Sequence, residues 1–93
     1  MIGVAVLGST GSIGESTLDV LARHPDRFRL VALGARRNAA RLAEQCVRWR
    51  PDYAALADES AAQELRAKLA AAGVRTRVLA GESALEELAA GKL

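Results

Sequence analysis

The feature that most constrains this chain is a run of regularly spaced glycines directly behind its first apolar segment. Residues 2–7 are apolar, and residues 8–14 follow as Gly-Ser-Thr-Gly-Ser-Ile-Gly. A short β-branched run without polar alternation is typical of a parallel strand that is covered on both faces. A strand followed by a glycine turn and the start of a helix is the arrangement that holds a diphosphate in dinucleotide-binding folds. The pattern therefore predicts an α/β domain with this turn at a ligand-binding edge.

The rest of the chain repeats the strand–helix unit three more times. We expect strands over 2–7, 28–33, 53–57 and 75–80, and helices over 13–23, 39–49, 60–72 and 83–90. This alternation with short connections predicts an α/β fold with a doubly wound, Rossmann-like parallel sheet of four βα units. A complete dinucleotide-binding fold has about six strands. Residues 1–93 are therefore expected to be the N-terminal part of such a domain.

Helical periodicity also predicts which side chains face the core. Asn38 is expected to cap the helix over 39–49, because Asn is a favoured N-cap residue. Val47 is expected on the apolar side of that helix together with Cys46. In the last helix, the residues expected to face inward are Leu85, Leu88 and Ala89.

Each glycine of the first turn has an expected task at a diphosphate site. Gly8 lets the chain turn sharply off the strand, Gly11 lets the backbone approach the diphosphate, and Gly14 lets the helix pack close to the sheet. Free N–H groups at the start of the helix then face the phosphates. The alternative is a tight glycine turn without a ligand, but its position after the first strand favours phosphate binding. The residues assigned to this site are Gly8, Thr10, Gly11, Ser12, Ile13 and Gly14.

A second candidate site follows the strand over 28–33, where residues 34–38 read Gly-Ala-Arg-Arg-Asn and are expected to form a loop. NAD-specific sites usually place a carboxylate there to accept the ribose 2′-hydroxyl, and this segment offers none. Arg36 and Arg37 suit a 2′-phosphate instead, through charge-assisted contacts. The alternative is that both are ordinary solvated loop residues. The position favours NADP(H).

Composition excludes several other classes of function. Eleven of the thirteen basic residues are Arg, but they alternate with acids and lack an aromatic platform, so nucleic acid is not expected as a partner. The longest apolar run is far shorter than the roughly 20 residues needed to span a bilayer, so a membrane is not expected as a partner either. The single His24 and the single Cys46 cannot form a metal cluster, and Cys46 is expected to be a buried, inert thiol. His24 precedes a proline at a helix end and is expected either at the surface or as a capping residue. Without a leader or a membrane segment, a cytoplasmic protein is expected.

The glycine run is also part of a longer family signature. Residues 6–14, followed by Ser-Thr-Leu-Asp-Val at 16–20, resemble the amino-terminal signature of the 1-deoxy-D-xylulose 5-phosphate reductoisomerases. The resemblance continues through Pro25 and Phe28 to residues 31–33, Asn38, 44–46 and Pro51. It implies an oxidoreductase of non-mevalonate isoprenoid biosynthesis. Such an enzyme isomerises and reduces its sugar phosphate with NADPH to 2-C-methyl-D-erythritol 4-phosphate, using a divalent metal (Mg or Mn).

The resemblance assigns roles position by position. Residues 10–13 match the family's diphosphate loop, and Arg37 and Asn38 match its basic residue and Asn at the 2′-phosphate. The family usually has Gly before that basic residue, whereas this chain has Arg36, with a glycine displaced to Gly34. Two interpretations stay open: the loop follows a different path, or Arg36 adds a second phosphate contact.

The resemblance places the metal and substrate ligands beyond residue 93, in catalytic and C-terminal domains that are absent from this chain. The chain by itself is therefore expected to contain no catalytic or metal-binding residue and to be inactive, and the full-length protein is expected to be a homodimer. Two alternatives remain: another NADP-dependent dehydrogenase such as a semialdehyde dehydrogenase, or a non-catalytic dinucleotide-binding module.

Overall fold

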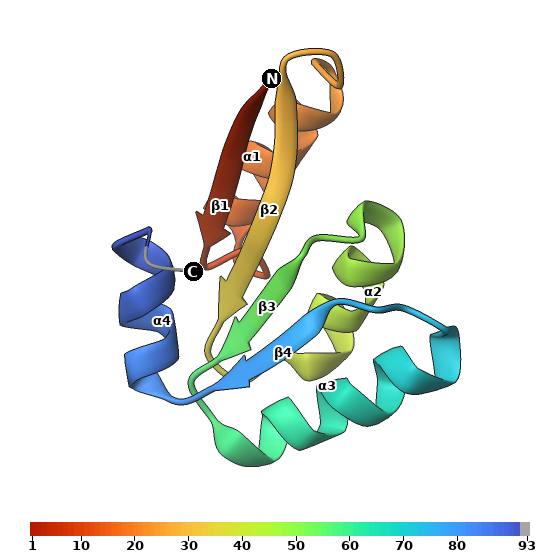
Figure 1. Ribbon diagram of the computed structural model, residues 1–93, viewed down its shortest axis with the longest axis vertical. Helices are drawn as coiled ribbons and strands as arrows, with labels where there is room; N and C mark the ends of the chain where they lie inside the picture. Colours follow the sequence, from red (N-terminus) through yellow and green to blue (C-terminus); the bar gives the residue numbers. More distant parts are fainter. Residues whose placement is uncertain (92–93) are drawn as a thin grey trace.

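The computed structural model describes residues 1–91 and contains four strands that alternate with four helices (Figure 1). The strands are β1 (Ile2–Leu7), β2 (Phe28–Ala35), β3 (Tyr53–Leu56) and β4 (Arg77–Ala80). The helices are α1 (Ser12–Ala22), α2 (Ala39–Trp49), α3 (Glu59–Ala72) and α4 (Glu82–Ala89). All strand pairs are parallel, in the order β1-β2-β3-β4. The predicted α/β class and the four βα units are confirmed.

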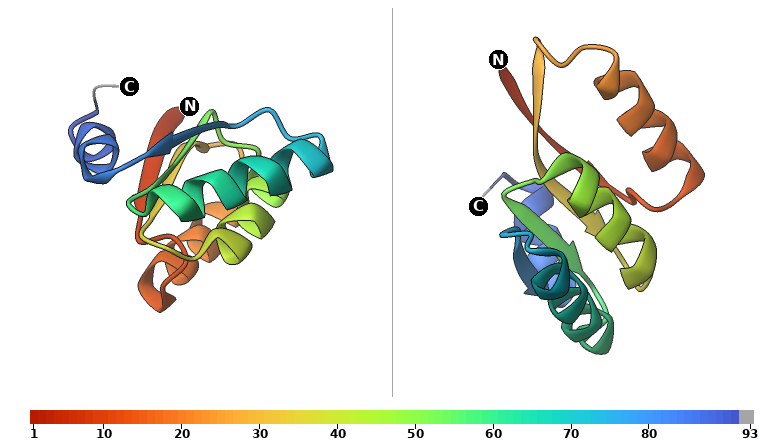
Figure 2. Two further views of the ribbon diagram at one scale, coloured as in Figure 1. Left: turned by 90° about the horizontal axis from the view of Figure 1, so that it is seen from below. Right: turned by 90° about the vertical axis from the view of Figure 1, so that its right-hand side faces the viewer.

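Helices cover both faces of the sheet, as a doubly wound fold requires. Helices α1, α2 and α3 lie on one face, and α4 lies on the other (Figure 2). The larger core, beneath the first three helices, includes the fully buried Leu33, Leu42, Leu56 and Leu65. Beneath α4, a smaller core consists of Ala32, Ala55, Ala84 and Leu88. Small residues on that face let α4 approach the sheet closely.

Strand β2 is longer than predicted and ends at Ala35, so the expectation of a loop beginning at Gly34 is wrong. Gly34 pairs with Leu7 of β1 and with Ala55 of β3, and the two neighbouring strands hold it in the sheet. A β-carbon at residue 34 would come within 2.9 Å of the Leu7 side chain and 3.0 Å of the Leu85 side chain. The glycine therefore serves close packing within the sheet rather than a turn.

Strand β4 begins two residues later than predicted, at Arg77. The preceding residues are held by other contacts: Val74 N donates to Leu69 O at 3.0 Å, and Thr76 Oγ1 donates to Pro51 O at 2.7 Å. The helix ends agree better with the sequence. Asn38 caps α2 by accepting from Arg41 N at 3.1 Å, as predicted, and Gly73 ends α3 in the left-handed conformation.

Three predictions about burial are wrong. Strand β1 is not covered on both faces in the described part of the chain: Ile2 is 62% exposed and Leu7 46%. The reason is that β1 lies at an edge of the four-stranded sheet. Val47 is 45% exposed, because Gln45 instead occupies the buried flank of α2. Ala89 is exposed, since α4 buries only a narrow stripe containing Ala84 and Leu88.

Candidate functional site at the carboxyl edge of the sheet

The two loops predicted to bind the cofactor lie at the same edge of the sheet, where β1 and β2 end. The glycine turn is joined directly to β2, because Ser9 N donates to Gly34 O at 3.0 Å. A hollow at this edge is lined by the last residues of β1 and β2, by Gly8 and Arg36 that directly follow them, and by α4. Ligands of open α/β sheets bind at the carboxyl ends of the strands. Of the residues that the sequence assigned to the cofactor, Gly8 and Arg36 line this hollow, whereas the others do not.

Two of the three loop glycines are required by the fold itself. Gly8 has φ +65°, the left-handed conformation that favours glycine. A β-carbon on Gly14 would lie 2.1 Å from Gly8 O and 2.6 Å from Ser9 Cα, so that only glycine lets α1 begin against this turn. Gly11 differs from both. Its φ is −83°, and a β-carbon there would meet nothing closer than Gly8 O at 3.4 Å.

The start of α1 leaves several backbone donors available. Gly11 occupies the N-cap position and supplies no side-chain cap. Gly11 N donates to Gly8 O at 3.0 Å, and Glu15 N donates to Gly11 O at 2.9 Å. Within residues 1–91, the remaining N–H groups of this turn have no hydrogen-bond acceptor; they belong to Thr10, Ser12, Ile13 and Gly14. Unpaired donors at a helix N-terminus, with the positive end of the helix dipole behind them, suit an anion.

Two side chains of helix α2 contact the glycine turn and the start of α1. The Gln45 side chain is 4% exposed, and its Nε2 donates to Ser9 O at 2.7 Å. Arg41 forms a half-buried ion pair with Glu15 of α1, with 3.0 Å between Arg41 Nε and Glu15 Oε1. The hydrogen bond from Arg41 lowers the pKa of the Glu15 carboxyl and raises that of the guanidinium.

The two predicted arginines lie in different surroundings. Arg36 forms an ion pair with Glu82 at the start of α4. The Arg37 side chain is exposed and lies close enough to Asp58 that its charge contributes to lowering the pKa of that carboxyl, after the larger effects of hydrogen bonds from Ser60 and Ala61. The Asn38 side-chain oxygen is used by the α2 cap. Both arginines and both carboxylates line one small hollow beside the end of β2, together with Ala57.

Sequence reasoning missed three contributors to this region: Gln45, the Arg41–Glu15 pair and Glu82. Gln45 carried a usable signal, because a polar residue stood between Leu42 and Cys46 on the buried stripe of α2. No sequence pattern indicated Glu82 or Glu15, since their partners Arg36 and Arg41 lie 46 and 26 residues away along the chain.

The remaining titratable candidates stay outside this site. Cys46 is buried, as predicted, and burial raises the pKa of its thiol to about 12, so it is a poor nucleophile. His24 lies on the surface, as predicted, with its ring edge-on to Phe28. Among residues 1–91, no group of three or more His, Cys, Asp or Glu side chains could hold a metal ion.

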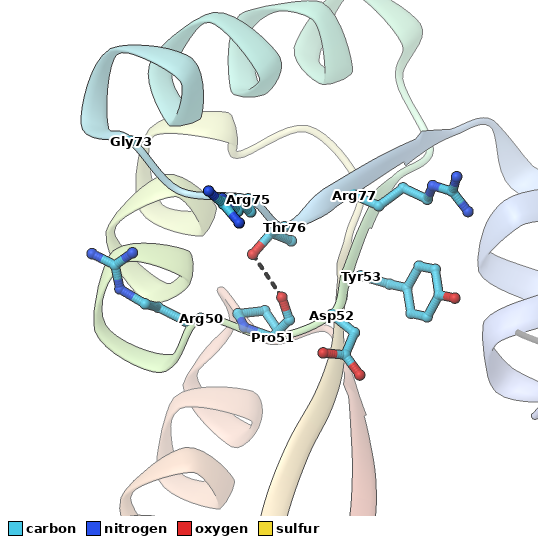
Figure 3. Close-up of a pocket in the computed structure, with 8 residues that line it drawn as sticks. All are labelled: Arg50, Pro51, Asp52, Tyr53, Gly73, Arg75, Thr76 and Arg77. Carbon is cyan, nitrogen blue, oxygen red and sulfur yellow. Dashed lines mark hydrogen bonds between the residues drawn. The ribbon is translucent and has the colours of Figure 1, made fainter.

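Another hollow lies at the opposite edge, where β3 and β4 begin (Figure 3). It is lined by Arg50, Pro51, Asp52, Tyr53, Gly73, Arg75, Thr76 and Arg77. The three guanidinium groups point in different directions rather than toward one centre (Figure 3). Asp52 is already paired with Arg29 at 2.7 Å. Nothing there converges on a ligand, and the carboxyl edge remains the candidate site.

No helix within the described residues is long and apolar enough to cross a membrane.

Comparison with known proteins places this site in a family. A family model described as 1-deoxy-D-xylulose 5-phosphate reductoisomerase matches residues 4–92. The reductoisomerase of Methylococcus capsulatus is 60% identical over 90 residues, which are 96% of this chain and 23% of that protein. That of Nitrosomonas europaea is 54% identical over 86 residues, which are 92% of this chain and 21% of that protein. The chain thus spans about a fifth of the length of these relatives.

Solved structures agree with this assignment. The reductoisomerase from Zymomonas mobilis in complex with NADPH superimposes with a TM-score of 0.86 at 43% identity, over 95% of this chain and 23% of that one. A reductoisomerase in complex with NADPH, fosmidomycin and magnesium gives 0.89 at 32% identity, over 96% of this chain and 22% of that one. The resemblance seen in the sequence is confirmed: the chain belongs to the 1-deoxy-D-xylulose 5-phosphate reductoisomerase family.

Proposed function

We propose that this chain is the N-terminal part of the NADPH-binding domain of a 1-deoxy-D-xylulose 5-phosphate reductoisomerase. The observation that carries the proposal is the turn over 10–14. Four N–H groups there have no acceptor within residues 1–91, and they surround Gly11, a glycine that the fold itself does not require. Because Gly11 has no side chain, it leaves room for a group that approaches the backbone of the turn. The NADPH bound by the solved relative from Zymomonas mobilis supports the choice of ligand.

In this proposal the residues of the chain bind and orient the cofactor. The four free N–H groups of the turn donate to diphosphate oxygens, aided by the dipole of α1 and by the Thr10 and Ser12 hydroxyls. Arg37 and Asn38 lie beside the 2′-phosphate, and Arg36 is the second cation at that position. When bound, NADPH would supply a hydride for reduction of the substrate.

The activity of the whole protein belongs to the same proposal. We infer a cytoplasmic, homodimeric enzyme of non-mevalonate isoprenoid biosynthesis that isomerises and reduces 1-deoxy-D-xylulose 5-phosphate to 2-C-methyl-D-erythritol 4-phosphate. Magnesium and fosmidomycin are bound by a solved relative of which this chain covers 22%. The described residues do not fit a divalent cation, since they contain no cluster of ligands. The metal and the sugar phosphate would therefore be bound by other parts of the protein, and this chain alone would be inactive.

Membership of this family argues against a semialdehyde dehydrogenase. The second candidate, a non-catalytic dinucleotide-binding module, would share the same cofactor site and differ only in lacking turnover. A chimera distinguishes them: residues 4–92 would replace the matching segment of the Methylococcus capsulatus reductoisomerase, with which the chain is 60% identical. Turnover with NADPH supports the enzyme. A folded chimera that binds NADPH without turnover supports the binding module.

Calorimetric titration of the 93-residue chain with NADPH and NADH tests cofactor binding directly. We expect tighter binding of NADPH, and loss of that preference, by about 1–3 kcal/mol, in an Arg36→Ala/Arg37→Ala variant. Equal affinity for the two cofactors would contradict the arginine assignment but leave the glycine turn in place. If the chain and the chimera are both folded and neither binds NADPH, the proposed function is wrong.

A further inference from the structure

A buried glutamine reaches the backbone of the glycine turn from the neighbouring helix. Gln45 lies on α2, is 4% exposed, and its Nε2 donates to Ser9 O at 2.7 Å. Ser9 is itself fully buried, and its N–H donates to Gly34 O of β2 at 3.0 Å. Ser9 is therefore held on both of its backbone polar groups, by β2 at the nitrogen and by α2 at the oxygen.

Stability alone does not account for a glutamine at this position. Gln45 Oε1 and Ser9 Oγ are both buried without a hydrogen-bond partner among the described residues. Unpaired polar atoms destabilise a core, and the other buried residues of α2 are apolar: Ala39, Leu42, Ala43 and Cys46. An apolar side chain at residue 45 would continue that stripe. Gln45 Nε2 is directed at the turn, and a hydrogen bond from Gln45 also contributes, after the larger effects of Arg41, to lowering the pKa of Glu15 on α1.

That hydrogen bond also determines where the next N–H group points. Ser9 C=O and Thr10 N–H belong to one peptide unit, which is planar, and none of the described peptide bonds is cis. In a trans peptide the two groups point in opposite directions. With the Ser9 carbonyl directed inward at Gln45, the Thr10 N–H points outward, on the side where the donors of the turn have no acceptor.

We propose that Gln45 is a positioning residue for the cofactor, holding the Ser9–Thr10 peptide in the orientation that presents Thr10 N–H to the diphosphate. Gln45 touches no ligand itself and acts only through the turn. This inference rests on the proposed function, because it assumes that the turn binds the diphosphate.

The test is a Gln45→Met substitution, which keeps the length of the side chain but removes the donor. The diphosphate is common to both cofactors, so the affinities for NADPH and NADH should fall together, by about fivefold or more, with their ratio unchanged. The midpoint of thermal unfolding should stay close to that of the wild type, because the substitution removes the unpaired Oε1 together with the donor. Gln63→Met, on the exposed side of α3, is the matched control and should change neither quantity.

Two further measurements separate positioning from folding. The amide resonance of Thr10 should shift in unliganded Gln45→Met, because the Ser9–Thr10 peptide loses its anchor. In the chimera with the Methylococcus capsulatus enzyme, the KM for NADPH should rise while kcat is retained. If Gln45→Met does not fold, Gln45→Leu provides the same test, since this apolar side chain of similar size also cannot donate to Ser9 O.

The outcomes are distinguishable. Wild-type cofactor affinity in a folded Gln45→Met protein overturns the inference and leaves the proposed function standing. A fall in affinity that only parallels a loss of folded protein also overturns it, because Gln45 would then be structural. A folded wild-type chain and a folded chimera that both fail to bind NADPH overturn the proposed function, and the inference with it.

Discussion

Gly14 lies so close to Gly8 that a β-carbon on residue 14 would come within 2.1 Å of the Gly8 carbonyl oxygen. The atoms in the way belong to the backbone of the turn and cannot rotate aside. We expect Gly14→Ala to lower the free energy of unfolding by about 1–3 kcal/mol, because α1 must move away from the turn. Urea unfolding measures this change. Stability equal to that of the wild type would mean that the turn and α1 are not packed as described.

Gly11→Ala is the matched comparison and should behave in the opposite way. A β-carbon at residue 11 meets no atom closer than 3.4 Å, so the fold should lose less than about 1 kcal/mol, mainly from a poorer N-cap residue. The added methyl group would occupy the space that the proposed diphosphate needs. NADPH affinity, measured by calorimetry, should therefore fall by about tenfold or more. Unchanged affinity would contradict the role of Gly11 in the proposed site.

The Arg36–Glu82 ion pair predicts unequal roles for the two arginines. Because Glu82 already neutralises Arg36, Arg37→Ala should reduce the preference for NADPH over NADH more than Arg36→Ala does. In a Glu82→Gln background Arg36 loses its partner, and the effect of Arg36→Ala on NADPH binding should grow. Calorimetry at low salt measures all four variants, since exposed ion pairs are screened by salt. If Arg36→Ala has the same effect on NADPH binding with and without Glu82→Gln, then Glu82 and the 2′-phosphate do not compete for Arg36.

The Glu15–Arg41 ion pair predicts that the stability of the folded chain depends on pH in the acidic range. The hydrogen bond from Arg41 lowers the pKa of Glu15 below its usual value of 4.5 in the folded chain. A carboxyl whose folded pKa is depressed contributes stability above the unfolded pKa, and this contribution is lost as the pH falls through the folded pKa.

Urea unfolding of the wild type and of Glu15→Gln tests this dependence. The wild type should be the more stable near neutral pH, and the difference should shrink below pH 4.5 and disappear as the pH falls through the folded pKa of Glu15. Glu87→Gln, at an exposed position of α4, serves as the control. A difference between wild type and Glu15→Gln that persists in acid would show that the carboxyl acts through packing rather than charge.

The sequence by itself determined the features that depend on neighbouring residues. The alternation of apolar runs and helical periodicity predicted four βα units. The spacing of Gly8, Gly11 and Gly14 located the turn, and Asn38 was correctly expected to cap α2. These features follow from backbone geometry and from hydrogen bonds that span a few residues, so a single sequence carries them.

The tertiary structure decided what depends on residues far apart in the chain. It placed β1 at an edge, kept Gly34 within the sheet, and brought Gln45 to Ser9 and Glu82 to Arg36, across 36 and 46 residues respectively. Helical periodicity also placed Val47 on the buried side of α2, where Gln45 lies instead. Periodicity gives the spacing of a buried stripe but not the direction from which neighbouring elements pack. That direction is set only when the strands take their order and each helix takes its face of the sheet.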